Sequence, residues 1–438
     1  MHSIWTETAK IGAFPPLRGD AKTDVLIIGG GMAGVLCARS LHDAGVDYIL
    51  VEGGRIGGGV TKNTTAKITS QHGLIYHRLC KDAGVVKAGM YLNANEAALA
   101  KFRSLSAGIA CDFEDKGAYV YSLRDRGAIE DEMAALQEIG FPAAFEKELP
   151  LPFRIAGAVR FPGQAQFHPL KFLAGITRGL NIYEHTFVEE LAPHTATTRY
   201  GKITAGEIIV ATHFPFLNKH GGYWLKMFQH RSYAIALEGA PDVGGMVLEE
   251  AEDGLSFRNY GNLLILGGGG HKTGKQGGNW GVLREFAAHA YPHAREKGAW
   301  ATQDCMTLDA VPYIGHYGKY AEGMYVAAGF NKWGMTGAMV SAMLLTDLIR
   351  GRENEFAGVF SPQRGICKPQ LLVNGLSAAG SLLTPTAPRC PHMGCALKWN
   401  RSERSWDCPC HGSRFKEGGG LIDNPATGPL QRGAKHGN

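Results

Sequence analysis

The sequence of 438 residues has no run of eighteen or more apolar residues and no block of like charges. A helix that crosses a membrane needs such a run, so no membrane span is expected. The first twenty residues hold acids and prolines and lack the apolar core of a signal peptide. The net charge is only +5, from 45 basic and 40 acidic residues, which gives no support for a nucleic-acid partner. We therefore expect a cytoplasmic protein of about three domains.

Cysteine is too sparse and too scattered for a secreted disulfide framework. Of the nine cysteines, four lie close together near the C-terminus. The other five show no regular spacing and are expected to be buried thiols: Cys37, Cys80, Cys111, Cys305 and Cys367. Glycine, by contrast, is abundant at 60 residues and gathers in loops. Such loops suit a chain that brings its backbone close to a phosphate-bearing cofactor.

The clearest pattern lies near the C-terminus and combines cysteine with histidine. Cys390 and His392 form a C-x-H pair, and after fifteen residues Cys408 and His411 form a C-x-x-H pair. Two thiolates on one iron and two imidazoles on the other suit a [2Fe–2S] cluster. A zinc site is an alternative, although structural zinc favours paired cysteines and paired histidines at other spacings. A plain disulfide staple is a second alternative, but it leaves the histidines unexplained.

The strings CPHMGC and WDCPCHGSRF resemble the Rieske iron–sulfur domain. The resemblance implies that Cys390 and Cys408 bind one iron, and that His392 and His411 bind the other. It also implies a disulfide between Cys395 and Cys410, as in the cytochrome-bc type of Rieske domain. Ser413 is a candidate hydrogen-bond donor to the cluster.

A dinucleotide-binding pattern lies near the N-terminus. Five features follow one another: a strand at Thr23–Ile28, a glycine turn at Gly29 to Gly34, a helix at Met32–Ala44, a second strand at Tyr48–Val51 and the acidic residue Glu52. The first glycine permits the tight turn, the second lets a pyrophosphate approach, and the third lets the helix pack on the strand. The acidic residue can accept from ribose hydroxyls. The candidate cofactor residues are Gly29, Gly31, Met32, Ala33, Gly34 and Glu52. An ordinary tight turn is the alternative.

A long Gly/Thr loop follows Glu52 and offers more main-chain N–H groups and hydroxyls than NAD needs. Here the chain resembles FAD-dependent oxidoreductases of the D-amino-acid oxidase type, the glycine oxidase and sarcosine oxidase group. In that family the loop wraps the pyrophosphate and ribityl chain, which implies roles for Gly59, Thr61, Thr64 and Thr65. The resemblance also places Val188 beside the adenine. Without the resemblance, the loop could be flexible surface.

A second strand, glycine turn and helix occur between Gly323 and Ile349. In the family this element covers the flavin ring, and the helix dipole stabilises negative charge on reduced flavin. The resemblance implies that Gly329, Phe330, Gly334, Met335 and Thr336 approach the flavin and that Lys332 faces its reactive edge.

A run of four glycines, Gly267–Gly270, precedes His271 and Lys272. We interpret this run as a tight loop near the flavin that presents both side chains to a substrate. A solvated loop is the alternative.

The predicted fold class is α/β: a Rossmann-like FAD-binding domain with an inserted α+β substrate domain, followed by a small all-β Rieske domain. The oxidoreductase part spans residues 1–355. Its FAD-binding parts are about 22–85, 165–215 and 305–352, and its substrate-domain parts are about 86–164 and 216–304. Residues 356–379 form a linker, and residues 380–438 form the Rieske domain. That domain is short and is expected to depend on packing against the flavoprotein.

The expected function is an FAD-dependent oxidoreductase that oxidises a small substrate, such as an amine or amino acid. The Rieske [2Fe–2S] cluster then passes the electrons singly to an external electron carrier. One alternative is a redox sensor or electron-transfer protein without a substrate of its own. Another is a Rieske oxygenase, which would need a mononuclear iron held by two histidines and a carboxylate. The pattern leaves the substrate, the direction of electron flow and the oligomeric state open.

Overall fold

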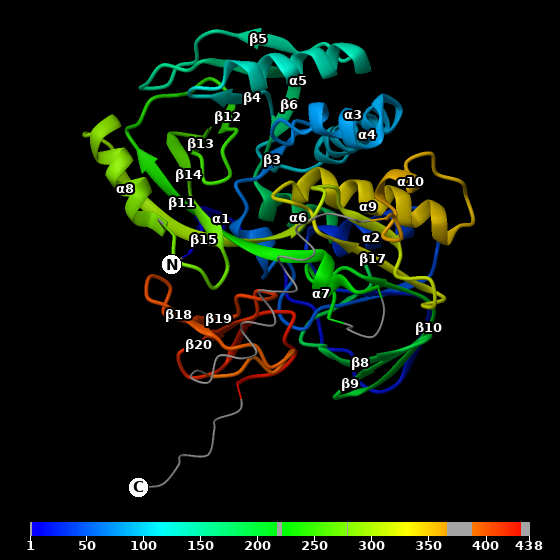
Figure 1. Cartoon of the computed structure of the whole chain (residues 1–438). Helices are drawn as coiled ribbons and strands as arrows, with labels where there is room; N and C mark the ends of the chain where they lie inside the picture. Colours follow the sequence, from blue (N-terminus) through cyan, green and yellow to red (C-terminus); the bar gives the residue numbers. More distant parts are fainter. Residues whose placement is uncertain (1, 217–220, 278, 366–387, 431–438) are drawn as a thin grey trace, which may run out of the picture.

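The computed structural model describes residues 2–216, 221–277, 279–365 and 388–430, which form three sheets with covering helices (Figure 1). Cys367 and most of the predicted linker lie outside these ranges. No helix within them is long and apolar enough to cross a membrane.

The first sheet has eight strands in the order β16-β17-β10-β1-β2-β7, and β9 and β8 continue it from β10. β1 runs parallel to both β2 and β10, so its second half is buried on both faces, which explains its unbroken apolar run. The strands are β1 (Ala21–Ile28), β2 (Tyr48–Val51), β7 (Ile182–Tyr183), β8 (Val188–Ala192), β9 (Thr195–Thr198), β10 (Gly201–Val210), β16 (Tyr313–His316) and β17 (Met324–Ala328).

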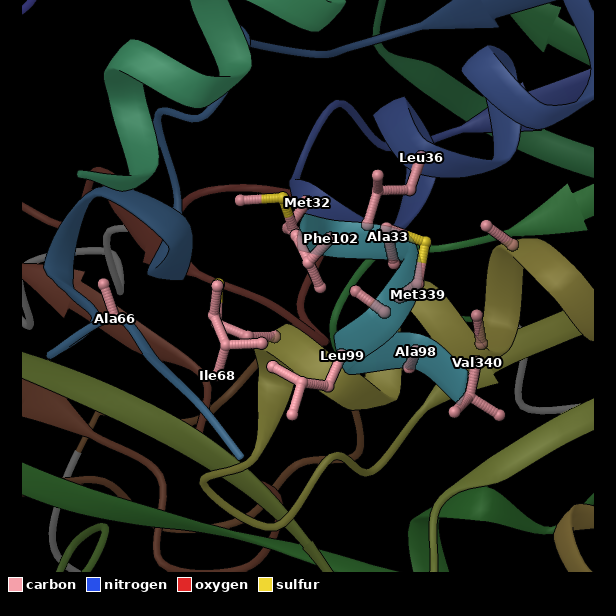
Figure 2. Packing of buried hydrophobic residues seen from close by; sticks show 14 of the residues in the cluster. Met32, Ala33, Leu36, Ala66, Ile68, Ala98, Leu99, Phe102, Met339 and Val340 are labelled. Atoms are coloured by element: carbon pink, nitrogen blue, oxygen red, sulfur yellow. The ribbon is translucent and has the colours of Figure 1, made fainter. Parts of the chain in front are cut away.

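The main core lies where three helices and a short strand meet (Figure 2). Helix α2 (Met32–Asp43) packs against α9 (Gly334–Ile349), which also contacts α4 (Val85–Ser106). Small residues such as Ala33 on α2 and Ala98 on α4 let the helices approach closely. The beginnings of α2 and α9 are thereby fixed relative to one another.

The second sheet has nine strands drawn from two separate stretches of chain, β3 to β6 and β11 to β15. The order is β15-β11-β14-β13-β12-β4-β6-β3, with β5 paired to β6. The strands are β3 (Lys67–Ile68), β4 (Glu114–Ser122), β5 (Ala144–Glu146), β6 (Gly157–Gln166), β11 (Met227–Glu238), β12 (Met246–Glu249), β13 (Ser256–Tyr260), β14 (Leu263–Lys272) and β15 (Arg295–Thr307). The remaining helices are α1 (Ile4–Thr8), α3 (Tyr76–Ala83), α5 (Arg126–Ile139), α6 (Pro169–Ile176), α7 (Tyr223–Lys226), α8 (Asn279–Ala290), α10 (Ala357–Phe360) and the short 3₁₀ helix η1 (Val60–Asn63).

The interpretation of Gly267–Gly270 as a loop is wrong, because these residues belong to strand β14. The pairing of β14 with β11 shifts register between Arg231 and Tyr233, which marks a β-bulge. At the bulge Gly269 has a φ of +61°, and a Cβ there would clash with the main chain of Asn279. The glycines therefore serve close packing inside a sheet, and no substrate loop exists at this position.

The third sheet is small and antiparallel, with the strands β18 (Lys398–Asn400), β19 (Ser405–Asp407), β20 (Arg414–Lys416) and β21 (Leu421–Asp423) in sequence order. It lies next to β11 and β15 (Figure 1). Within the described chain, its core consists of seven buried apolar residues, of which four are cysteines. That this small unit depends on packing against the flavoprotein stays a prediction.

The first residues of the predicted linker contact the larger part of the chain. Arg364 pairs with Asp309 and also donates to the main-chain oxygens of Pro312 and Phe360. Residues 357–365 thus pack on the larger part of the chain. The predicted fold class, an α/β part followed by a small all-β part, is confirmed.

Candidate functional site

A single cavity of about 1080 Å³ runs between the three sheets. Its wall includes the glycine turn before α2, the Gly/Thr loop and the beginning of α9. The third sheet also contributes to the wall, through residues 421–424, 426 and 427. Elements that are remote in sequence therefore surround one space. Most of the predicted cofactor residues line it: Gly29, Gly31, Met32, Ala33, Glu52, Gly59, Thr61, Thr64, Thr65, Val188, Phe330, Gly334 and Met335.

The turn before α2 leaves no room for side chains. Gly29 has a φ of +111°, and a Cβ there would lie 2.6 Å from the main-chain oxygen of Ala211. A Cβ at Gly34 would clash with the main-chain oxygen of Gly29. The chain can therefore turn tightly and bring the beginning of α2 to the cavity, where the Met32 N–H donates to the Thr61 hydroxyl at 3.1 Å. A phosphate group fits this position, because helix N-termini carry unpaired N–H groups and a partial positive charge.

Glu52 connects the turn with the loop that follows. Its carboxylate accepts from the main-chain N–H groups of Gly30 and Gly54, at 2.7 and 2.6 Å. Burial raises the pKa of this carboxyl, and the two N–H groups only partly offset the effect. A carboxylate offers about four acceptor positions, so two remain for a ribose diol. This arrangement is consistent with the predicted role of Glu52.

Buried donors hold the Gly/Thr loop from behind. The indole N–H of Trp5 donates to Thr64 O at 2.7 Å, and that of Trp300 donates to Asn63 O at 2.9 Å. Arg258 donates to Thr65 O at 2.6 Å. Because these main-chain oxygens have partners within the protein, the loop is held in place beside the cavity.

The turn before α9 contains two consecutive residues in the left-handed region, Asn331 and Lys332, with φ values of +50° and +73°. Asn331 locks this turn, because its amide accepts from Thr307 N–H at 2.7 Å and donates to Gly329 O at 2.6 Å. Lys332 lines the cavity, and its Nζ donates to Glu252 O at 3.2 Å. Two predicted cofactor residues here, Gly329 and Thr336, do not line the cavity.

Those two residues have clear structural roles. Gly329 has a φ of +73° beside Thr307, where a side chain would clash. The Thr336 hydroxyl donates to Thr69 O at 3.2 Å. His72, which also lies close to Thr336, stacks on Trp333 at a centroid distance of 4.8 Å. Burial lowers the pKa of His72 to about 3, so its imidazole is neutral.

His271 and Lys272, predicted to be catalytic, are not among the described residues that line the cavity. His271 stacks on the ring of Tyr233, and Lys272 lies over the ring of Phe228. Both belong to the end of β14 that faces the third sheet. Their catalytic role stays a prediction without support from this geometry.

The sequence pattern did not single out three polar residues of the cavity wall: Lys67, His213 and Asp304. Burial, together with the nearby Arg258, lowers the pKa of Lys67 to about 7. Burial raises the pKa of Asp304, which accepts from the Ser232 hydroxyl at 3.1 Å. Only for His213 did the sequence offer a signal. This residue directly follows Val210–Thr212, where a strand that leads toward the dinucleotide is expected to end.

The two Cys/His loops of the third sheet come together at one end of it. The rings of His392 and His411 lie 4.9 Å apart between centroids. Cys390 from the first loop and Cys408 from the second are both buried in the same small core. Nδ1 of His411 is buried and has no hydrogen-bond partner within the described chain. Two thiols, two imidazoles and an available ring nitrogen fit a [2Fe–2S] cluster.

Cys395 and Cys410, the predicted disulfide pair, are both buried at the same place. Their sulfur atoms and that of Cys408 all lie within 4.8 Å of one another. The structure shows them as thiols, so the disulfide stays a prediction.

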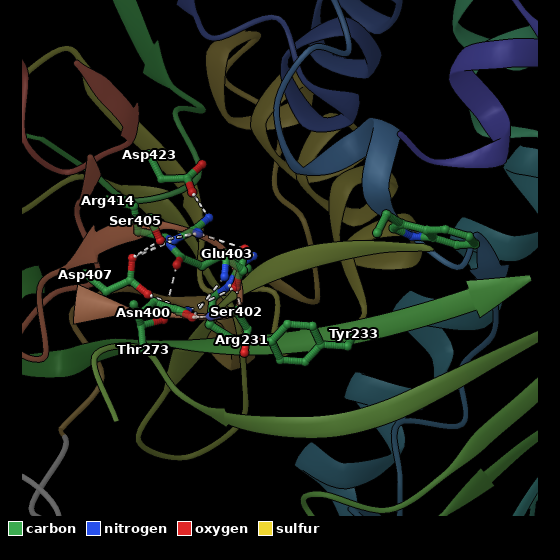
Figure 3. Close-up of polar contacts among 12 residues, drawn as sticks. Arg231, Tyr233, Thr273, Asn400, Ser402, Glu403, Ser405, Asp407, Arg414 and Asp423 are labelled. Carbon is green, nitrogen blue, oxygen red and sulfur yellow. Dashed lines mark hydrogen bonds and ion pairs between the residues drawn. The ribbon is translucent and has the colours of Figure 1, made fainter. Parts of the chain in front are cut away.

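A buried network of charges fixes the third sheet to β11 (Figure 3). The carboxylate of Glu403 accepts from Arg231 Nε at 2.9 Å and from Arg414 Nη2 at 2.7 Å. The Tyr233 hydroxyl also donates to it, at 3.0 Å. Arg414 further pairs with Asp407 at 3.0 Å. Because Tyr233 lines the cavity, the network reaches from the cavity wall into the third sheet.

Replacing Glu403 by glutamine is expected to destabilise the attachment of the third sheet by about 3–5 kcal/mol, because a buried guanidinium loses its counter-ion. Urea unfolding followed through the absorbance of the bound cluster would measure the loss. Glu417→Gln, which breaks the exposed pair with Arg404, is the control and should cost at most about 1 kcal/mol. Equal effects of the two substitutions would contradict the assigned role of Glu403.

The same contact should weaken in acid. Burial alone would raise the pKa of Glu403, but Arg231 and Arg414 outweigh burial and lower it. The folded state therefore favours the carboxylate. The contribution of this contact to stability is present above the ordinary pKa of 4.5 and is lost as the pH falls below it.

Comparison with known proteins agrees with both parts of this site. A model of the family described as FAD dependent oxidoreductase matches residues 24–348, and one described as Rieske [2Fe-2S] domain matches residues 377–433. The chain is 31% identical to YhfW of Bacillus subtilis (strain 168), a protein named as a Rieske 2Fe-2S iron-sulfur protein. That alignment covers 98% of this chain and 97% of YhfW.

Solved structures of similar fold match the larger part of the chain. Glycine oxidase from Geobacillus kaustophilus superposes with a TM-score of 0.67 at 21% identity, covering 79% of this chain and all of that one. L-proline dehydrogenase from P. horikoshii superposes with a TM-score of 0.64 at 18% identity, covering 79% of this chain and 98% of that one. These likenesses show a shared fold.

The chain therefore belongs to the FAD-dependent oxidoreductase family and carries a C-terminal Rieske domain. The larger part binds FAD, and the Rieske domain binds a [2Fe–2S] cluster. The protein is an oxidoreductase with two redox centres.

Proposed function

We propose that the protein oxidises a small amine or amino acid and passes the electrons singly through the Rieske cluster to an external one-electron carrier. The observation that carries the proposal is the shared cavity, whose wall is built by the FAD-binding elements and by β21 of the Rieske domain. FAD accepts two electrons at once, whereas the cluster changes by one electron. A flavin and a cluster side by side can therefore convert a two-electron oxidation into single-electron steps.

The charge of the cavity wall supports an amine substrate. Five acidic residues line the part formed by β12, the segment after it and β15: Glu249, Glu250, Glu252, Asp253 and Asp304. A protonated amine entering this region would meet negative charge and hydrogen-bond acceptors. Lys67, which faces the cavity without an ion pair in the described chain, could receive a carboxylate of the same substrate. We propose Lys332 as the side chain nearest the reacting edge of the flavin.

The electrons of the proposed reaction balance as follows. The substrate would lose two electrons and two protons. FAD in the cavity would supply two-electron chemistry, and the [2Fe–2S] cluster, which Cys390, Cys408, His392 and His411 would hold, would supply one-electron chemistry. The two electrons would thus leave one at a time to the external carrier, and the protons would leave to water. The external carrier is thus a one-electron acceptor.

Anaerobic mixing with panels of amines, amino acids and hydroxy acids tests the proposal. An effective substrate should bleach the flavin absorbance, and the cluster should then show the EPR signal of its reduced form. Dithionite reduction serves as the positive control for both centres. If no compound bleaches the flavin while dithionite reduces both centres, the enzyme proposal fails, and an electron-transfer or sensor role takes its place.

A further inference from the structure

The second cluster loop of the Rieske domain lies against the flavoprotein and not against solvent. His411 is 2% exposed, and its ring contacts the rings of Phe214 and Trp224 at 6.4 and 6.3 Å between centroids. Gly412 has a φ of +83°, and a Cβ there would lie 2.5 Å from Cβ of Gln229. A loop that approaches a neighbouring strand so closely is held at a fixed place.

Two buried glutamines on neighbouring strands hold this loop by its main chain. Gln229 on β11 donates to His411 O at 2.8 Å, and Gln303 on β15 donates to Gly412 O at 2.9 Å. The Gln303 amide also donates to Gln229 Oε1. Thr273 supports the pair from the other side, because its hydroxyl donates to Gln303 Oε1 at 3.1 Å. Consecutive carbonyls of a ligand loop are thus bound by a preorganised pair of amides.

Gln229 is also hydrogen-bonded to the wall of the flavin cavity. The same amide nitrogen donates to Asn424 O at 3.0 Å, and Asn424 lines the cavity. Asn424 in turn donates to Thr212 O at 2.5 Å and to Phe214 O at 2.9 Å. Those two carbonyls flank His213, whose backbone is left-handed with a φ of +69°.

His213 forms the cavity end of this arrangement. This residue lines the cavity, directly after Thr212 and before Phe214, whose main-chain oxygens Asn424 binds. Its Nε2 is buried and has no hydrogen-bond partner among the described residues. A buried ring nitrogen without a hydrogen-bond partner costs folding free energy unless a bound ligand supplies that partner.

We propose that Gln229 is the positioning residue that couples the two redox centres, by holding the His411 loop beside His213 of the flavin cavity. A continuous hydrogen-bonded contact then runs from Asn424 in the cavity wall through the Gln229 amide to the main chain of the cluster ligand His411. This inference rests on the proposed relay of electrons from flavin to cluster. It adds the residues that fix the distance and the contact between the two centres.

The test uses the full-length holoprotein and does not need the substrate. Flash photoreduction of the flavin with a deazaflavin and a sacrificial donor is followed by the absorbance changes of flavin and cluster. In Gln229→Met, a side chain of similar length loses both donated hydrogen bonds. We expect flavin content, cluster content and the EPR signal of the cluster to be preserved. The rate of electron transfer from flavin to cluster should fall about tenfold or more, because misplacing reacting groups by about 1 Å can cost up to about 10²-fold in rate.

Gln164→Met is the matched control, because Gln164 is also buried and donates to a main-chain oxygen, that of Pro162, but lies on β6. Its transfer rate should equal that of the unmodified protein. A second variant, His213→Asn, keeps a residue that tolerates the left-handed backbone and removes the imidazole. The His213→Asn substitution should also slow electron transfer from flavin to cluster. If Gln229→Met loses its cluster, His213→Asn becomes the variant that decides the test.

The possible failures can be told apart. If electrons do not pass from flavin to cluster even in the unmodified protein, the proposed relay is wrong. If electrons pass from flavin to cluster in the unmodified protein, and the decisive variant transfers them at the same rate as the Gln164→Met control, the proposed relay is supported. The role given to Gln229 is then overturned.

Discussion

A Cys408→Ser protein is expected to bind FAD normally and to lack the iron–sulfur cluster. Cys408 is fully buried in the second ligand loop, and its sulfur lies within 4.8 Å of those of Cys395 and Cys410. Serine offers a much poorer iron ligand than a thiolate. The visible absorbance and the EPR signal of the reduced cluster should therefore disappear, whereas the flavin spectrum should remain, because most of the flavin cavity is built by the larger part of the chain.

The control for this result is Cys80→Ser. Cys80 is a half-buried thiol on α3, far along the chain from the ligand loops, and its replacement should leave both cofactors in place. Iron content, flavin absorbance and EPR before and after dithionite measure both variants. A Cys408→Ser protein that still gave the EPR signal of a histidine-ligated cluster would contradict the ligand assignment.

Gly34→Ala is expected to abolish FAD binding. The added methyl group would occupy the position of the Gly29 carbonyl, so α2 must move away from the turn or the turn must open. Overpacking of this kind usually costs about 1–3 kcal/mol. Here it would also displace the N–H groups at the start of α2, where we expect the pyrophosphate to bind. The flavin content of the purified protein measures the effect.

Gly358→Ala provides the comparison for Gly34→Ala. Gly358 also lies in a helix, α10, but a Cβ there would meet nothing within 4 Å. Alanine should be neutral or slightly stabilising at this position, and full flavin content is expected. Normal flavin content in both variants would show that α2 does not need the close approach at Gly34.

The sequence allowed prediction of those features that are contiguous along the chain. The strand, turn and helix around Gly29 and the two Cys/His loops each lie within a short stretch, so spacing alone identifies them. Gly267–Gly270 was misjudged, because a run of glycines normally indicates a loop. Its real cause, the approach of Asn279 to a bulged strand, is a tertiary contact that no local pattern reveals.

The remaining features of the site depend on residues that lie far apart in sequence. Arg231 and Glu403 are separated by 172 positions, and Gln229 and His411 by 182. Each of these residues is unremarkable in its local sequence. The interaction within each pair is strong because both of its side chains are buried. Their burial follows from the packing of β11 against the Rieske domain. Lys67 and His213 likewise gain their significance from the cavity that they face.

The Rieske part of the cavity wall has a consequence for truncated forms of the protein. A chain that ended before residue 388 would leave Arg231 on β11 without its carboxylate partner Glu403, and it would open the cavity where residues 421–424, 426 and 427 now line it. We expect such a shortened protein to be less stable than the full-length one, because an apolar cavity wall and an unpaired guanidinium would then meet water.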